Sequence, residues 1–289
     1  MTKFDYNAFK KSFKKIAKAI NKNNYTYSNE ILYAACGGVS ILPPQTATQA
    51  DIDKLSSVML LVGRAYAASP ERRKGAKSVN DGMITFFKAI AKSIVAHSDY
   101  DGWRNRVISI AKYKYDYNGK QSDYDLLIES KDCVLSLNKM LREAIRDFDK
   151  SVLGDIKNCI SFCTKLLHFI VPHIFYIKDS ISWDAIWSIY GRQSDSTLKY
   201  GNNPQLDIPQ YLFGDELNTR YPLFKAERGK GDLHNTPEKE YWYLCCGCYA
   251  VSCVLKDIKL ISQTKGFNGI PNIYSLPRLV DSVLLNIHH

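Results

Sequence analysis

Apolar residues recur every three or four positions along most of this chain, which is the spacing of one face of an α-helix. Near the start, Phe9, Phe13, Ile16 and Ile20 share one face, and lysines surround the other. The same period predicts further helices over residues 83–94, 137–148, 155–170, 183–190, 237–256 and 277–287. Alternation with a period of two is scarce, so the predicted fold class is mainly α.

Turn-forming residues divide these helices. Pro237 and Pro277 stand where a helix accepts a proline, in its first turn. Asn118 and Gly119 form a strong turn signal, and a short strand or hairpin over residues 112–120 is one interpretation. The long irregular segment 191–235 has the composition of a binding loop or a cover over a site.

The chain has 289 residues, enough for one helical domain with a substantial core. A two-lobed arrangement, with residues 1–150 and 151–289 on either side of a cleft, is the alternative. The formal net charge of +10 favours a polyanion such as DNA as a partner. No apolar run is long enough to span a bilayer, and the N-terminus lacks a signal core, so we expect no membrane association.

These features predict a cytoplasmic protein whose eight cysteines are thiols. Cys245 and Cys248 have the CxxC spacing, but no second pair of cysteines or histidines follows at the interval of a zinc site. Small buried apolar residues are therefore the expected role of these cysteines. No nucleotide or dinucleotide fingerprint occurs, so no cofactor and no metal is expected. The oligomeric state is left open.

A lysine and an aspartate provide the candidate chemistry. Lys165 belongs to an apolar helix that Pro172 ends, and Asp179 stands before the next helix. A neutral lysine amine can attack the anomeric carbon of a sugar and form a Schiff base. A carboxylate can activate that nucleophile and balance the positive charge that develops on the sugar. The pair therefore suits nucleophilic catalysis in which a carboxylate activates an amine.

Residues 163–180 resemble the catalytic stretch of helix-hairpin-helix DNA glycosylases, in particular the divergent group similar to 8-oxoguanine DNA glycosylase. Residues 63–73 resemble another stretch of that group. The resemblance implies a helical fold with a central cleft, DNA as partner, and excision of a modified or damaged base. It also implies that Lys165 begins a helix and is the Schiff-base nucleophile, and that Asp179 is the activating carboxylate. Whether an AP-lyase activity accompanies base excision is left open.

The chain departs from the family pattern in two ways. The family's hairpin carries a Gly-x-Gly turn that presents backbone amides to a DNA phosphate, and residues 158–164 contain no glycine. The interval between Lys165 and Asp179 is also shorter than the usual one. Helix N-termini or basic side chains would have to bind the phosphate instead.

Three residues are candidates for a base pocket. His168 lies one turn after Lys165, where it could tune the amine or contact a substrate, although a hydrogen-bonded core histidine is the commoner outcome. Trp183 and Tyr66 could stack on an extruded base, as glycosylases require, or belong to the core.

The densest basic patch away from the N-terminus contains Arg64, Arg72 and Arg73, which are candidates for contacts with the DNA backbone. Solvated surface charge is the alternative for this patch. Similarly, Lys165 could be a surface lysine and Asp179 only a helix cap. The functional alternatives are a non-catalytic nucleic-acid-binding or interaction module, and an enzyme acting on free nucleosides or nucleotides.

Overall fold

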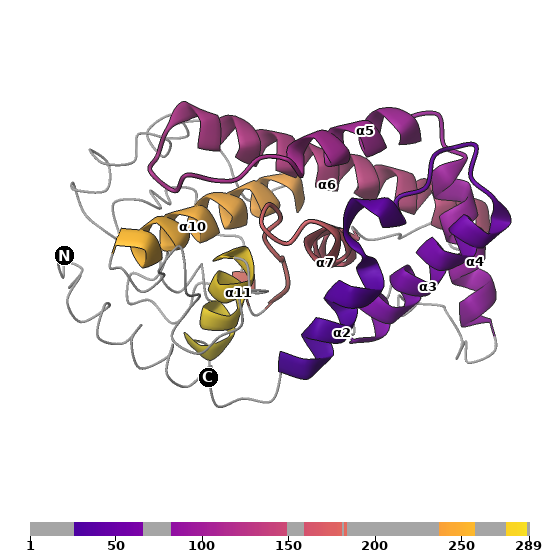
Figure 1. Cartoon of the computed structure of the whole chain (residues 1–289), viewed down its shortest axis with the longest axis horizontal. Coiled ribbons are helices and arrows are strands. Elements are labelled where there is room, and N and C mark those ends of the chain that lie inside the picture. The colour runs from indigo at the N-terminus through magenta and orange to yellow at the C-terminus, as the bar shows by residue number, and fades with distance from the viewer. Residues whose placement is uncertain are drawn as a thin grey trace. The chain divides into compact units, whose positions relative to one another are not determined.

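The computed structural model describes residues 26–65, 82–148, 159–180, 182–183, 237–257 and 276–287. Within these ranges the chain forms eight α-helices and one 3-10 helix, with no strand (Figure 1). The predicted mainly α fold class is therefore confirmed for the described residues. The helices are α2 (Thr26–Cys36), η1 (Gly38–Ile41), α3 (Gln49–Ala65), α4 (Met83–Val95), α5 (Tyr100–Ile110), α6 (Gln121–Phe148), α7 (Ile160–Ile170), α10 (Pro237–Asp257) and α11 (Leu276–Ile287).

The chain divides into two units, each built from separate stretches of sequence. Among the described residues, unit 1 contains 114–128 and everything from Tyr176 onward, and unit 2 contains 26–113 and 129–175. Helix α6 belongs to both, because its first eight residues are in unit 1 and the rest in unit 2. The expected division into residues 1–150 and 151–289 stays a prediction.

The core of unit 2 is a set of packed helices. Helix α4 packs against α3, and its predicted apolar face is buried, with Phe87 and Ile90 fully enclosed. Polar atoms in this core find partners across helices. The Tyr100 hydroxyl donates to the Pro43 carbonyl at 2.8 Å, and the Trp103 indole donates to the Cys133 carbonyl at 2.8 Å. These bonds satisfy groups that would be costly to bury alone.

Helix α7 is buried on nearly every side. It packs against α2, α3 and η1, and all its residues except Ser161 are buried. The helix begins at Ile160, so the predicted start at residue 155 is wrong, because Cys159 already lies outside the helix. The reason lies in α6: the Asn138 side chain accepts the Cys159 N–H at 2.7 Å and satisfies a donor at the start of α7.

Unit 1 contains α10 and α11, which lie side by side (Figure 1). Both predicted helices are confirmed, with prolines in their first turns as expected. Tyr176, which follows α7, is buried in this unit and shares a hydrogen bond of 2.9 Å with Ser252 on α10. That bond ties the segment leading to Asp179 to α10.

The possible strand or hairpin over residues 112–120 does not form. The backbone there bonds to side chains instead of to a second strand: Asp116 N–H donates to the Asp123 carboxyl group at 2.8 Å, and Gly119 N–H donates to the Tyr249 hydroxyl at 3.0 Å. Tyr115 and Tyr249 also contact each other edge to face. Because these partners come from α6 and α10, the local turn signal could not reveal them.

Other expected features lie outside the described residues. They are the lysine-rich helix at the N-terminus, the segment 191–235, and the predicted helix 183–190 beyond Trp183.

Candidate functional site

Lys165 occupies the middle of α7, as the sixth of its eleven residues. The helix start that the resemblance implies for this lysine is therefore wrong. The side chain is buried, with 4% of its surface exposed, and its neighbours along α7 are mostly apolar. Lys165 is thus not a surface lysine. Lysine is rarely buried to this degree unless it is paired or functional.

His168 is fully buried one turn after Lys165, and two hydrogen bonds define its ring. Nδ1 lies 2.8 Å from the Phe175 carbonyl, and Nε2 lies 2.7 Å from the Tyr33 hydroxyl. A carbonyl only accepts, so Nδ1 carries a proton, and in the neutral ring Nε2 accepts from Tyr33. The expectation of a hydrogen-bonded core histidine is confirmed. A substrate could bind a ring nitrogen only by displacing one of these partners.

Asp179 caps the start of the helical segment that follows it. Its Oδ1 accepts the Ser182 N–H at 2.7 Å, and the Ser182 hydroxyl accepts the Asp179 N–H at 2.9 Å. This reciprocal pair is a capping box, which satisfies two backbone donors at the helix start. The capping role considered for Asp179 is therefore confirmed, and a catalytic role stays a prediction.

Trp183 is buried in unit 1, with 7% of its surface exposed. The Lys178 ammonium lies 5.7 Å from the ring centroid, over its face. A cation at this position can interact favourably with the aromatic ring. A base that stacked on the same face would have to displace Lys178, so the predicted pocket role requires a rearrangement there.

The CxxC segment lies within α10, and its thiols are buried. Burial raises the pKa of the Cys248 thiol well above its usual value, and Cys245 adds to that shift. The negative charges of Asp281 and Asp179 raise the pKa of this thiol further. A thiol in such surroundings is unreactive. Among the described residues, no group of three or more His, Cys, Asp or Glu side chains could hold a metal ion.

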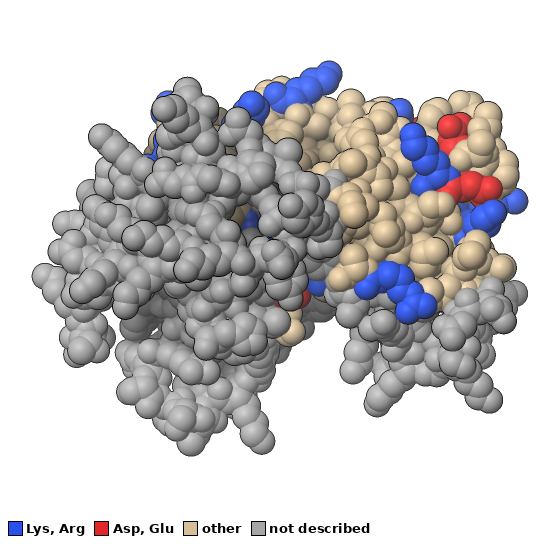
Figure 2. Space-filling view, turned by 60° about the horizontal axis from the view of Figure 1, so that its bottom comes forward, with Lys and Arg blue, Asp and Glu red and all other residues tan. Residues whose placement is uncertain are grey.

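Arg64 is exposed in the last turn of α3, where a cation also complements the helix dipole. Arg72, Arg73 and Tyr66 lie outside the described residues. On the face drawn in Figure 2, the described Lys and Arg side chains are spread out and do not gather into one block. Contact of Arg64 with a DNA backbone stays a prediction.

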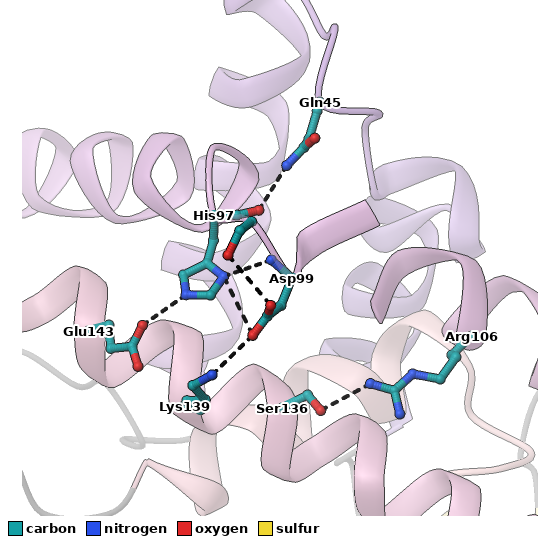
Figure 3. A network of polar contacts seen from close by, with 8 residues as sticks. Gln45, His97, Asp99, Arg106, Ser136, Lys139 and Glu143 are labelled. Atoms are coloured by element: carbon teal, nitrogen blue, oxygen red, sulfur yellow. Dashed lines mark hydrogen bonds and ion pairs between the residues drawn. The ribbon is translucent and has the colours of Figure 1, made fainter. Parts of the chain in front are cut away.

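A polar network in unit 2 was not anticipated from the sequence (Figure 3). His97, between α4 and α5, accepts the Asp99 N–H on Nδ1 at 3.0 Å and lies 2.8 Å from Glu143 through Nε2. Lys139 donates to the Asp99 carboxylate at 3.0 Å, and Gln45 donates to the His97 carbonyl at 2.8 Å.

This network holds the turn between α4 and α5 against α6. Because Nδ1 of His97 already accepts a backbone N–H, the neutral ring carries its proton on Nε2 and donates it to Glu143. No lone pair of the ring then remains for a substrate proton, so the geometry favours a structural role over general-base catalysis. Glu143 and Lys139 come from α6, about forty positions or more away in the sequence, and no local pattern marks them.

Lys165 belongs to unit 2 and Asp179 to unit 1. Of the candidate residues, Lys165 and His168 lie on the same helix. Asp179 and Trp183 lie in the same helical turn, where the Trp183 N–H donates to the Asp179 carbonyl at 3.0 Å. The pairing of Lys165 with Asp179 stays a prediction.

No family model, curated protein or solved structure matches this chain. The resemblance to helix-hairpin-helix glycosylases therefore depends on the short segments described above. Within the described ranges, no helix combines the length and the apolar character needed to cross a membrane.

Proposed function

We propose that this chain is a DNA glycosylase-like enzyme that excises a modified or damaged base. Lys165 is the nucleophile, and Asp179 is the activating carboxylate. The proposal requires both side chains to reach the same sugar. DNA is the substrate, and exposed cations such as Arg64 bind its backbone.

The burial of Lys165 is the observation that carries the proposal. A lysine in the middle of an apolar helix loses most of its hydration, and loss of hydration disfavours the charged ammonium. The neutral amine is the form that attacks carbon and forms Schiff bases. A surface lysine would provide no such argument.

The covalent step follows from this amine. The Lys165 nitrogen attacks C1′ of the target nucleotide, and the bond between C1′ and the base breaks. The base leaves with the electron pair of that bond and takes the proton that the amine gives up through Asp179. The bond between C1′ and the ring oxygen then breaks while the nitrogen forms a double bond to C1′, and the ring oxygen takes the remaining proton of that nitrogen, which yields a Schiff base. Borohydride reduces such a Schiff base to a stable amine, which gives the proposal a direct test.

The test is borohydride trapping on a panel of oligonucleotides, each bearing a different base lesion. The wild type should become covalently attached to at least one of them, and Lys165→Met should not. Methionine has nearly the same length and shape as lysine and is apolar, as most of the neighbours along α7 are, so the fold should tolerate it. Lys92→Met is the matched control, because Lys92 is an exposed lysine on α4. It should trap as well as the wild type.

Two substitutions at Asp179 separate capping from catalysis. Asparagine caps helices about as well as aspartate but cannot accept a proton, whereas alanine loses the cap, at a cost of about 1 kcal/mol. Asp179→Asn should therefore unfold at the wild-type thermal midpoint but release no base. Asp179→Ala should unfold at a lower midpoint and also release no base. If Asp179→Asn releases bases at the wild-type rate, the catalytic role of Asp179 is wrong.

Absence of both base release and trapping across the panel would contradict the proposal as a whole. Binding of oligonucleotides without release would then favour the non-catalytic nucleic-acid-binding module.

A further inference from the structure

We infer that Tyr33 is a positioning residue for Lys165, acting through His168 on the orientation of α7. This inference rests on the proposed function, because it concerns the amine that the proposal makes the nucleophile. Tyr33 lies on α2, far from Lys165 in the sequence.

The contacts form a chain across three segments. The Tyr33 hydroxyl binds Nε2 of His168 at 2.7 Å, and Nδ1 of the same ring binds the Phe175 carbonyl at 2.8 Å. The Tyr33 ring also packs on Phe169, with 4.8 Å between ring centroids. His168 on α7 is thereby bonded both to α2 and to the segment that follows α7.

Rotation of α7 is the property that this chain of contacts controls. Residues three apart on a helix are neighbours on its surface, so His168 and Lys165 turn together when the helix turns. Close apolar packing already limits the rotation of α7, and two directional hydrogen bonds to one rigid ring restrict it further. The bonds of His168 therefore help to place the part of α7 from which the Lys165 side chain extends.

Lysine reactivity is sensitive to such placement. A displacement of about 1 Å can cost roughly a hundredfold in the rate of an attack that requires alignment. Loss of the Tyr33 hydroxyl leaves the apolar contacts of the ring in place and removes the bond that orients His168. Tyr33→Phe therefore removes one restraint on the rotation of α7 and leaves the apolar contacts of the ring in place.

The matched control is Tyr100→Phe. Tyr100 also lies in unit 2, and its hydroxyl also makes one hydrogen bond, to the Pro43 carbonyl at 2.8 Å. That bond joins α5 to the segment after η1 and does not involve α7. The two variants thus lose the same chemical group, and only Tyr33→Phe affects His168.

Two substitutions at His168 test its two hydrogen bonds separately. An asparagine amide can occupy the position of Nδ1 and keep the bond to Phe175, while it loses the bond to Tyr33. A glutamine amide reaches the position of Nε2 and keeps the bond to Tyr33. We expect His168→Asn and Tyr33→Phe to have the same effect, and the double variant to add little, because both remove one and the same contact.

Two measurements make the inference testable apart from the proposed function. The first is the rate at which Lys165 is methylated by formaldehyde and cyanoborohydride, followed by mass spectrometry of the Lys165 peptide in the whole chain. The second is the single-turnover rate of borohydride trapping. We expect Tyr33→Phe to change the methylation rate several-fold and to slow trapping by about tenfold to about a hundredfold. Tyr100→Phe should match the wild type in both, under conditions where every variant is folded.

The outcomes separate the two claims. Equal effects of Tyr33→Phe and Tyr100→Phe on Lys165 methylation would overturn the inference, because a general loss of stability would then explain both. So would trapping by Tyr33→Phe at the wild-type rate. A specific change in methylation, in a wild type that traps no oligonucleotide, would uphold the positioning role of Tyr33 and overturn the proposed function.

Discussion

Two polar networks hold irregular segments of this chain, and they do so in different surroundings. In unit 1, the buried carboxyl group of Asp123 binds Tyr249 and the Asp116 N–H, and so holds the segment 113–120. In unit 2, the network of His97, Asp99, Lys139 and Glu143 holds the turn between α4 and α5, where Asp99 and Lys139 are largely exposed (Figure 3).

The difference teaches that similar contacts contribute unequally to stability. The Asp123 carboxyl group is buried, so removing one of its hydrogen-bond partners leaves the cost of its desolvation uncompensated. An exposed ion pair is solvated before and after it breaks, and salt screens it. The unit 1 network should therefore dominate the stability of its segment, whereas the unit 2 network should act mainly on the geometry of its turn.

The largest effect is expected from Asp123→Ala. It leaves the Asp116 N–H and the Tyr249 hydroxyl without their acceptor inside the protein, and we expect a loss of about 3 kcal/mol in the free energy of unfolding. Urea denaturation measures it. Asp125→Ala is the control, since Asp125 is exposed two residues later and binds only the neighbouring turn through Gln121. Equal losses for the two variants would contradict the comparison.

Tyr249→Phe should have a smaller effect, of about 2 kcal/mol, because it removes one donor to Asp123 and one acceptor for the Gly119 N–H. The ring contacts of Tyr249 remain. Tyr113→Phe serves as the reference, since Tyr113 is 60% exposed and its hydroxyl is expected to be solvated. A chemical denaturation midpoint that is unchanged in Tyr249→Phe would show that the buried network contributes no more than a surface contact.

Alkaline pH should weaken unit 1. Burial raises the pKa of Tyr249 far above its usual value of 10.0, and Cys253 and Asp123 add to the shift. The folded state then keeps a proton that the unfolded state loses, so this contribution is complete below pH 10.0 and is lost as the pH rises above it. The free energy of unfolding should then decrease by up to about 1.4 kcal/mol per pH unit for each such tyrosine.

Thermal unfolding at a series of pH values from neutral to strongly alkaline measures this loss. The decrease in the free energy of unfolding per pH unit should be smaller in Tyr249→Phe than in the wild type. A slope equal to that of the wild type would show that Tyr249 keeps an ordinary pKa in the folded protein.

The smallest effect on the free energy of unfolding is expected from Lys139→Ala, because the bond of Lys139 to Asp99 is exposed. The hydrogen bond from Lys139 lowers the pKa of Asp99, so this contribution is present above the usual value of 3.8 and is lost as the pH falls through the lowered pKa. Added salt should shrink the difference between Lys139→Ala and the wild type. A larger loss that salt does not change would contradict the assignment of this network to the solvated surface.

Much of the fold could be predicted from the sequence. The apolar period of three to four residues located α4, α10 and α11, and the first-turn prolines located two helix starts. These signals are local, because a helix makes its backbone bonds within itself and needs an outer partner only for its apolar face. The predicted hydrogen-bonded core role of His168 also proved correct.

The sequence failed where a distant side chain determined the local structure. Asn138 satisfies the N–H of Cys159 and lies outside any pattern near α7, so the start of that helix was predicted too early. The tyrosine-rich segment 112–120 resembled a hairpin, but its N–H groups bind Asp123 and Tyr249. Such partners become neighbours only after the chain has folded.

The features of the candidate site also separate into those that the sequence specified and those that depended on the fold. The sequence by itself determined the helical class, the apolar character of α7 and the presence of a lysine within it. Only the tertiary structure decided that this lysine is buried, that Tyr33 and Phe175 hold His168, and that Asp179 caps a turn. The physical reason is that burial and side-chain hydrogen bonds depend on which segments surround a residue, and the order of amino acids specifies those segments only through the complete fold.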